Sequence, residues 1–461
     1  MPHTHSRIRA FLPRRVFPLY FTTAKNNLVA SYIPQEISEF ENLERLHLYG
    51  NTIGGGFPEF SKLSNLKSLG LMDIDLIGTI PSYLGTMTGL TTLALSQTKL
   101  YGSIPVSIAQ LTNLRILGLD GLGLTGHISP VLKLNKLEAL YLEDNHLTGE
   151  LYYNDWESME ELDISNNMIG GRLPEDLFHE KNIHVIDLHD NNIFGAFPEK
   201  IINNVNIEYI ALQGNAISGS LSDRIGYLVN LQHLDISGNK MSGTIPDTIQ
   251  LLTNLVSLST SGNSFDRQPL EDCFSPLINL KDISMKGNSF TGTLPDFFAL
   301  MTSLRMLDLD GNELRGTIPT WYGVMPNLSI LQLNRNELTG TIPTELSRLN
   351  NLKILLLDGN NLTGRTKEIC NSVGPNLSHF TSDCYPSMNS EAGPEVECRC
   401  CTLCCNDENP DCNNYDWSAS YNPTAKYGYL RPDYNFKLDQ APKGWRKKAE
   451  EEARAPNQYG V

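Results

Sequence analysis

Apolar and polar residues recur along most of the chain in a frame of about 24 positions. The segments LTTLALSQTKLYGSIPVSIAQLTN (90–113), LQHLDISGNKMSGTIPDTIQLLTN (231–254) and LRMLDLDGNELRGTIPTWYGVMPN (304–327) can be laid over one another. The frame runs from Leu43 to Asn376 as fourteen units of 22 to 25 residues. It therefore predicts one repeat array, although 461 residues would ordinarily suggest roughly two to four separate domains.

Each unit predicts a short strand followed by a turn. In LxxLxLxxN the apolar residues alternate, as they do in a strand that faces a shared core. The asparagine follows where the chain leaves the strand, so its amide can satisfy backbone groups of the bend. Units two to four have Ile74, Thr98 and Leu122 at this position, and we expect the ladder to be weakest there. The other eleven units predict a ladder of Asn51, Asn145, Asn167, Asn191, Asn215, Asn239, Asn263, Asn288, Asn312, Asn336 and Asn360.

The second half of each unit brings the chain back to the next strand. In Gly243-Thr-Ile-Pro246 the glycine permits a turn, the isoleucine is buried and the proline fixes φ. No unit can bury its apolar face alone, so the stack is cooperative and its ends need caps. The predicted fold is an α/β repeat solenoid with one parallel sheet.

The full pattern LxxLxLxxNxLxGxIPxxLxxLxx resembles the plant-type leucine-rich repeat of receptor-like proteins, receptor-kinase ectodomains and polygalacturonase inhibitors. The ending, with LTGRTKEIC, LSHFTSDC and EVECRCCTLCC, is similar to the cysteine cap of diatom leucine-rich-repeat proteins. The resemblance implies a right-handed superhelix with a concave parallel β-sheet and a convex side of short helical, 3-10 or irregular segments. It implies a recognition role but no shared ligand.

We expect four other segments around the array. Residues 1–25 form a basic, unstructured leader, 26–42 a partial N-terminal repeat, 377–412 a cysteine-rich cap and 413–461 a Tyr-rich polar tail. Plant-type arrays open with a cysteine-paired cap that contains tryptophan, whereas here no cysteine precedes Cys273 and no tryptophan precedes Trp156. We therefore expect the true start, with a signal or a membrane anchor, to lie upstream of Met1.

The cysteines leave three interpretations: a metal site, a lipid-anchor site or a covalent lid. Zinc sites bring together two separated ligand pairs, and only Cys401-Thr-Leu-Cys404 has such spacing. Palmitoylation needs a second membrane signal, yet the segment runs into acidic residues. An even number at the end of a solenoid favours a disulfide-bonded lid. Its members are Cys370, Cys384, Cys398, Cys400, Cys401, Cys404, Cys405 and Cys412.

Disulfide geometry adds one constraint on this lid. Adjacent cysteines pair poorly, because Cα atoms ~3.8 Å apart are closer than disulfides usually take. Cys400 and Cys401 should therefore bond in different directions, which staples the segment to something else through Cys370 and Cys384. Such a framework implies an oxidising compartment. We expect an extracellular or cell-surface protein, and glycosylation candidates at Asn327, Asn361 and Asn376 agree. The basic leader leaves a transit peptide as an alternative.

Composition and motifs exclude several functions. The formal net charge of −16 disfavours a nucleic-acid partner, and no apolar run is long enough for a membrane span. There is no HExxH, GxSxG, P-loop or kinase signature. We therefore expect no enzyme, no cofactor and no metal.

The densest ionisable cluster falls at concave positions of the middle units. It forms a candidate recognition strip for a partner with a basic face. The alternative is a solvated face, because Asp163, Asp187 and Asp235 occupy the ordinary LDL or LDI position of the repeat. The candidates are Tyr141, Glu143, Asp144, Asp163, Asp187, His189, Asp190, Tyr209 and Asp235.

These observations predict a non-catalytic recognition protein whose ligand is a protein, a peptide or a glycan. One alternative is the ectodomain fragment of a membrane receptor-like protein or receptor kinase. Another is an inhibitor of cell-wall hydrolases, which rests on family likeness alone. A third is an ice or mineral-surface binder that uses a row of hydroxyls: Thr79, Ser103, Ser220, Thr244, Thr293, Thr317 and Thr341.

Overall fold

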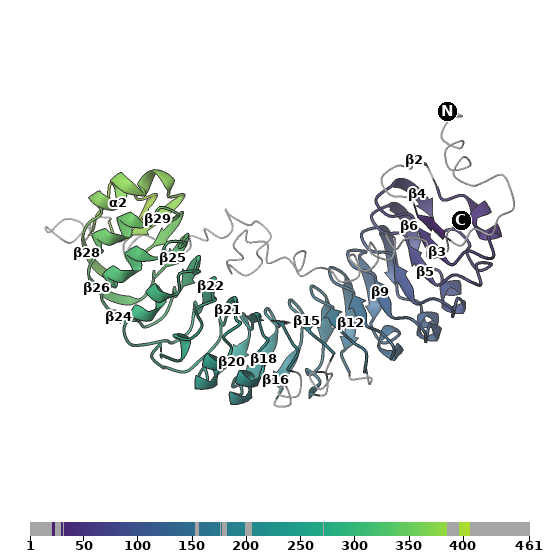
Figure 1. The fold of residues 1–461 in the computed structure, drawn as a ribbon, viewed down its shortest axis with the longest axis horizontal. Helices are drawn as coiled ribbons and strands as arrows, with labels where there is room; N and C mark the ends of the chain where they lie inside the picture. Colours follow the sequence, from purple (N-terminus) through teal and green to yellow (C-terminus); the bar gives the residue numbers. More distant parts are fainter. Residues whose placement is uncertain are drawn as a thin grey trace, which may run out of the picture. The chain divides into compact units, whose positions relative to one another are not determined.

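The computed structural model describes two compact units, each built from stacked turns of chain (Figure 1). Unit 1 ends at Phe194 and unit 2 begins at Gly195. The described residues are 21–23, 29–30, 32–152, 156–175, 177, 182–198, 205–270, 272–384 and 396–405. The first twenty residues of the expected leader, the tail 413–461 and Cys412 lie outside them.

Unit 1 has a main parallel sheet and a second parallel sheet on its flank. The main sheet contains β1 (Phe21–Thr23), β3 (Arg45–His47), β5 (Ser68–Gly70), β7 (Thr92–Ala94), β9 (Ile116–Gly118), β11 (Ala139–Tyr141), β13 (Glu161–Asp163) and β15 (Val185–Asp187). The flank sheet contains β2 (Val29–Ala30), β4 (Thr52–Gly56), β6 (Asp75–Thr79), β8 (Lys99–Ser103), β10 (Leu124–His127), β12 (His146–Glu150) and β14 (Met168–Gly170). Short 3-10 helices return the chain: η1 (Gln35–Glu39), η2 (Ser82–Thr86), η3 (Val106–Gln110) and η4 (Val131–Lys133).

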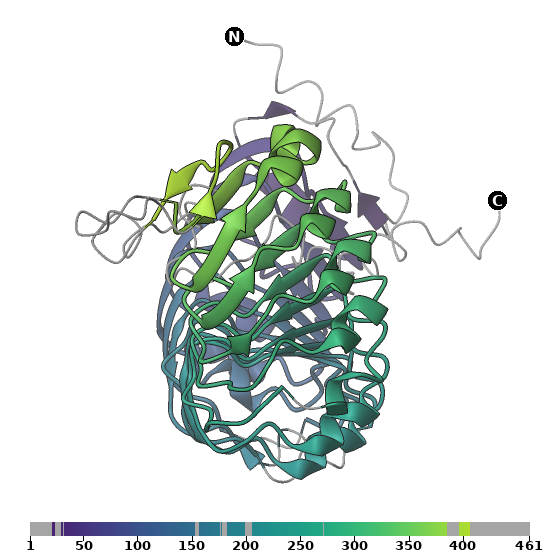
Figure 2. The ribbon, with the colours of Figure 1, turned by 90° about the vertical axis from the view of Figure 1, so that its left-hand side faces the viewer.

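Unit 2 repeats this plan, and its short helices stack along one side (Figure 2). Its main parallel sheet contains β17 (Tyr209–Ala211), β19 (His233–Asp235), β21 (Ser257–Ser259), β22 (Asp282–Ser284), β23 (Met306–Asp308), β25 (Ile330–Gln332), β27 (Ile354–Leu356), β29 (His379–Ser382) and β31 (Leu403–Cys404). Flank strands are β16 (Phe194–Ala196), β18 (Ala216–Gly219), β20 (Lys240–Met241), β24 (Arg315–Gly316), β26 (Glu337–Thr341), β28 (Asn361–Arg365) and β30 (Val396–Glu397). The helices are η7 (Asp223–Tyr227), η8 (Asp247–Leu251), η9 (Asp272–Phe274), η10 (Asp296–Leu300), η11 (Thr320–Val324), η12 (Thr344–Arg348), α2 (Lys367–Ser372) and η13 (Gly374–Asn376).

The leucine pattern sets both the strand register and the core. In one repeat, Leu304, Leu307 and Leu309 have no exposed surface. Leu307 pairs with Leu331 of the next strand, which occupies the same position of its own unit. Because side chains alternate along a strand, the neighbours of Leu307 point away from this core. We call that side of the main sheet its outer face.

The sheets extend beyond the segments that the repeat frame marked. Phe21–Thr23 was expected to be unstructured, but it forms strand β1, which pairs with β3. The partial repeat assigned to residues 26–42 therefore has its sheet strand before residue 26. Its sequence hid this strand because Thr22, which is in register with Leu46, replaces the usual leucine. At the other end, β29 and β31 continue the main sheet past Asn376.

An inner asparagine ladder joins each turn to the one before it. Asn336 donates from Nδ2 to the carbonyl of Leu333 in its own turn and to that of Leu309 in the preceding turn. Its Oδ1 accepts the amide N–H of Leu314, also in the preceding turn. Asn312 and Asn360 make the equivalent contacts. One side chain thus satisfies buried backbone groups of two turns.

A second ladder, which the sequence interpretation missed, runs along the exposed edge. Asn254, for example, donates to the carbonyl of Val229 at 2.8 Å. The sequence signal for this ladder is an asparagine directly before the residue that opens each repeat of about 24 positions. The members with a partner among the described residues include Asn65, Asn113, Asn182, Asn230, Asn254, Asn279, Asn327 and Asn351.

We predict that the two ladders contribute unequally to stability. Asn336→Ala leaves the Leu309 carbonyl and the Leu314 N–H buried without their hydrogen-bond partner. The substitution should therefore destabilise the surrounding turns by about 1–3 kcal/mol. The control, Asn254→Ala, removes one exposed bond and should cost less than about 1 kcal/mol. Hydrogen exchange of unit 2 amides measures both losses. Equal losses would contradict the distinction.

Candidate functional site

The structure places the predicted unit 1 residues at the carboxyl ends of neighbouring strands, but it buries most of them. Tyr141 and Glu143 are 3% and 7% exposed, and the Tyr141 hydroxyl donates to Glu161. Asp144 is exposed and accepts a hydrogen bond from Asn166 at 2.7 Å. The predicted recognition strip is therefore mostly shielded from solvent, and its part in ligand binding stays a prediction. The strands lie so close that neighbouring side chains shield one another.

Asp163 and Asp187 brace the turns that follow their strands. Asp163 is 3% exposed, and its Oδ1 accepts from the backbone N–H and the hydroxyl of Ser165. Asp187, 1% exposed, accepts from the backbone N–H of His189 and contacts its Nδ1. These bonds give the LDL and LDI aspartates a structural role. Of the unit 1 candidates, Asp144 and the half-buried Asp190 remain the accessible carboxylates.

Two predicted residues, Tyr209 and Asp235, belong to unit 2. Tyr209 packs against His233, with ring centroids 5.5 Å apart. Asp235 accepts from the backbone N–H and the hydroxyl of Ser237, at 3.0 and 2.6 Å. It therefore repeats the turn brace of Asp163. Their part in ligand binding stays a prediction.

An apolar patch covers part of the outer face of unit 2. Met306, Ile330 and Ile354 are in register on β23, β25 and β27, and Leu356 joins them. All four are 1–4% exposed. These four side chains pack closely against one another and form one apolar cluster on this side of the sheet.

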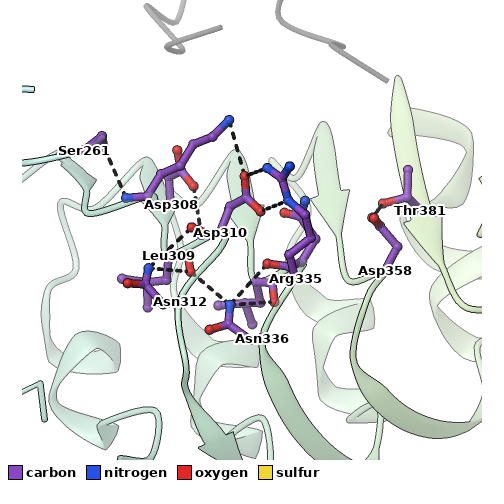
Figure 3. Close-up of polar contacts among 12 residues, drawn as sticks. Ser261, Asp308, Leu309, Asp310, Asn312, Arg335, Asn336, Asp358 and Thr381 are labelled. Atoms are coloured by element: carbon purple, nitrogen blue, oxygen red, sulfur yellow. Dashed lines mark hydrogen bonds and ion pairs between the residues drawn. The ribbon is translucent and has the colours of Figure 1, made fainter. Parts of the chain in front are cut away.

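A charged cluster follows the ends of strands β23 and β25 (Figure 3). Asp310, 1% exposed, receives two hydrogen bonds from the Arg335 guanidinium, and its Oδ2 lies 3.3 Å from Lys286 Nζ. The Arg335 side chain remains 46% exposed. Asp358 accepts from the hydroxyl of Thr381 on β29. The outer face of unit 2 thus joins buried apolar side chains to fixed charges.

Burial changes the ionisation of the carboxylates at this face. It raises the pKa of Asp308 to about 6, despite hydrogen bonds from Ser284 and the Asp310 N–H, and that of Asp282 to about 6. Burial also raises the pKa of Asp358. The hydrogen bond to Asp310 raises the pKa of Arg335 above its ordinary value.

The sequence interpretation missed this surface. Dense ionisable residues instead directed it to the repeats that hold Glu143, Asp163 and Asp187. The signal for the apolar patch lay in LRMLDL, LSILQL and LKILLL, where the positions between the leucines are apolar.

Two other surface features have structural explanations. A depression of about 490 Å³ in unit 1 is lined by Lys67, Arg115 and Lys136, but the first two pair with Glu44 and Glu138. The hydroxyl row is exposed at every expected position. A Cβ at Gly340 would lie 2.8 Å from the Thr317 methyl, and Gly340 has φ +81°. Thr317 therefore packs on the glycine of the next turn, which accounts for threonine at this position without a ligand.

The expected cysteine cap is present at the end of unit 2. Cys370 bonds to Cys400, Cys384 to Cys404, and Cys398 to Cys401. Cys370 and Cys384 thus anchor the cysteine segment to the last turns of the array, and adjacent Cys400 and Cys401 bond in different directions. Cys405 is also disulfide-bonded.

Three further features of the described residues bear on a metal site, on glycosylation and on a membrane span. Two cysteine trios come within 4.8 Å, Cys370–Cys398–Cys400 and Cys384–Cys398–Cys401, but all of these sulfurs belong to disulfides. Asn327, Asn361 and Asn376 are exposed. No helix in the described segments combines the length and apolar character needed to cross a membrane.

The family model described as Leucine Rich Repeat matches residues 158–179, 230–252, 303–325 and 327–349. These four segments match leucine-rich repeats, and the described strands have the leucine-rich-repeat fold. No curated protein matches the chain by sequence.

Solved structures with the same fold include ectodomains of plant receptors. The crystal structure of PEPR1–AtPEP1 is 26% identical, with a TM-score of 0.71 over 78% of this chain and 54% of that one. The ectodomain of the Arabidopsis thaliana receptor kinase GASSHO1/SCHENGEN3, in complex with CASPARIAN STRIP INTEGRITY FACTOR 2, is 26% identical (TM-score 0.58; 78% and 52%). The Arabidopsis receptor kinase HAESA, with the peptide hormone IDA and the co-receptor SERK1, is 26% identical (TM-score 0.51; 77% and 72%). The chain spans about half the length of the first two.

We predict that the purified protein contains the three disulfides of the cap. Non-reducing peptide mapping should recover the links Cys370–Cys400, Cys384–Cys404 and Cys398–Cys401. Reduction should lower local stability by about 2–4 kcal/mol and open the last turns first, because solenoid ends unfold independently. Free thiols with stoichiometric zinc would contradict this assignment.

We predict a pH-dependent gain in stability for Asp308→Asn. Burial raises the folded pKa of Asp308 to about 6, above the unfolded value of 3.8, so the folded protein holds this proton more tightly. Its favourable contribution is present below about pH 4 and is lost as the pH rises through 6. Asp308→Asn lacks this loss, and at pH 7.5 unit 2 should gain about 1–3 kcal/mol.

Urea unfolding of both proteins from pH 4 to 8 measures this difference. Burial lowers the pKa of His233 to about 4, which acts in the opposite sense, but both proteins share it. A difference between variant and wild type that is constant with pH would contradict the prediction.

Proposed function

We propose that this protein is a non-catalytic recognition protein that binds an extended peptide on the outer face of unit 2. The carrying observation is the apolar patch of Met306, Ile330, Ile354 and Leu356 together with the charged cluster of Asp310, Arg335 and Lys286. Apolar side chains supply binding energy, and the charges supply orientation and specificity.

The comparisons support a peptide rather than another ligand. HAESA is described in complex with a peptide hormone, and its leucine-rich repeats are 26% identical to this chain. The side chains of the outer face line up across parallel strands, so an extended chain can contact several turns at once. The proposal concerns the described repeats, because the chain covers only part of its structural neighbours.

We also propose an extracellular or cell-surface location. The three disulfides fit an oxidising compartment, and one structural neighbour is described as an ectodomain. The exposed Asn327, Asn361 and Asn376 are accessible to glycosylation.

A matched pair of glycine variants tests the peptide site. Arg335 and Asp144 both have left-handed backbone, with φ of 54° and 57°, so glycine relieves strain at each. Linear dodecamer peptides selected by phage display on the whole protein serve as ligands. Arg335→Gly should weaken their binding about tenfold, the 1.4 kcal/mol of one charged contact, whereas Asp144→Gly should leave it unchanged.

The opposite pattern would move the site to the acidic residues of unit 1. A peptide affinity that is lowered by Asp144→Gly and by added salt, but is unchanged by Arg335→Gly, would favour the recognition strip around Asp144 and Asp190. Selected peptides that protect no amide of β23, β25 or β27 from hydrogen exchange would contradict the proposed function.

A further inference from the structure

Gln332 is a buried side chain with unsatisfied hydrogen-bonding groups. It is the last residue of β25 and lies on the outer face, in register with Asp308 on one side and Leu356 on the other. Its exposed fraction is 0%. Neither its Nε2 nor its Oε1 has a hydrogen-bond partner in the described part of the protein.

Asn334 adds a third unsatisfied atom two residues further along the same chain. It is 7% exposed, and its Oδ1 is buried without a partner among the described residues. Residues two apart in extended chain project to the same side, so both amides belong to the outer face. Together they present one donor and two acceptors.

Folding gives no reason for an amide at position 332. The equivalent residue of the next strand is Leu356, which packs with Met306, Ile330 and Ile354. An apolar side chain at 332 would extend this patch, whereas an amide without partners loses its hydration and gains nothing. Buried polar atoms that the fold leaves unpaired are expected where a ligand pairs with them.

We propose that Gln332 and Asn334 form a subsite for the backbone of an extended peptide. In extended chain the N–H and C=O of one residue point to the same side, so Gln332 Oε1 accepts that N–H and Nε2 donates to that C=O. Asn334 Oδ1, two residues further along the same turn, accepts another backbone N–H of the ligand. This proposal rests on the proposed function and specifies how the outer face holds its ligand.

The subsite divides recognition between backbone and side chains. Pairing with the ligand backbone requires only that the paired residues carry free N–H groups and are not proline. Selection among sequences falls to the apolar patch and to Arg335. Among the described elements, the main-sheet neighbours of β25 are β23 and β27. The ligand therefore has to displace the side chains of these strands that shield the Gln332 amide.

The test is a double-mutant cycle between the protein and a selected peptide. Gln332→Met keeps the length of the side chain and removes both hydrogen-bonding atoms. Each backbone N–H of a display-selected dodecamer is then methylated in turn, and titration calorimetry measures its affinity for the full-length wild type and for the variant. The control is Gln232→Met, because the Gln232 amide already has a partner in Glu208.

We expect one methylation to weaken binding to the wild type at least tenfold and to have little effect on Gln332→Met. We also expect Gln332→Met to raise the unfolding midpoint of unit 2 by about 2–4 °C without ligand. Gln232→Met should change neither quantity.

Three results would overturn the proposal in distinguishable ways. A lowered unfolding midpoint for Gln332→Met would mean that its amide already has a partner in the free protein. In a second result, each methylation lowers the peptide's affinity equally for the wild type and for Gln332→Met, while the peptide still protects β25 amides from hydrogen exchange. This would contradict the subsite but not the proposed function. Peptides that bind elsewhere on the protein would contradict both.

Discussion

The structure depends on a hydrogen bond that each turn makes to the turn before it. The strands are three residues long, and a parallel ladder of that length is weak by itself. Asn336 compensates by satisfying the Leu309 carbonyl and the Leu314 N–H at the bend, where no strand partner is available. Because the amide spans two turns, it fixes their relative register as well as their separation.

That constraint also shapes the candidate site. With the backbone fixed by leucines and asparagines, each turn offers the outer face only the positions between them. On β23 these are Met306 and Asp308, and on β25 they are Ile330 and Gln332. The side chains of the outer face therefore form a regular grid of rows and columns. One substitution changes the side chain at one grid position and leaves the backbone in place. The same spacing brings side chains close enough to bury carboxylates such as Asp308 and to raise their pKa.

The repeat frame predicted the fold well because its signal is repeated. Leucine spacing located the strands, the asparagines located the bends, and the cysteine count indicated the cap. The frame failed where a turn departs from the pattern, as in Phe21–Thr23, which pairs through backbone atoms that leave little trace in sequence.

The site was less predictable, for a physical reason. Charge density marked Asp163 and Asp187, but whether a carboxylate is free depends on neighbours such as Ser165 and on lateral packing across strands. The same packing buries Gln332 without a hydrogen-bond partner among the described residues, which depends on the register of Asp308 and Leu356. A linear search does not compare residues 24 positions apart.

The two asparagine ladders have a consequence for how such an array changes length over evolutionary time. Asn327 and Asn351 reach back at the exposed edge, and Asn336 and Asn360 reach back at the buried bend. A deletion or duplication that begins and ends at equivalent positions, such as 304–327, restores both contacts at the new junction. A deletion or duplication of any other length shifts the asparagines after the junction by part of a turn, so that they no longer reach their carbonyl partners in the preceding turn. Genetic events that add or remove whole units are therefore the tolerated ones, and they carry grid positions such as Met306 and Asp308 with them.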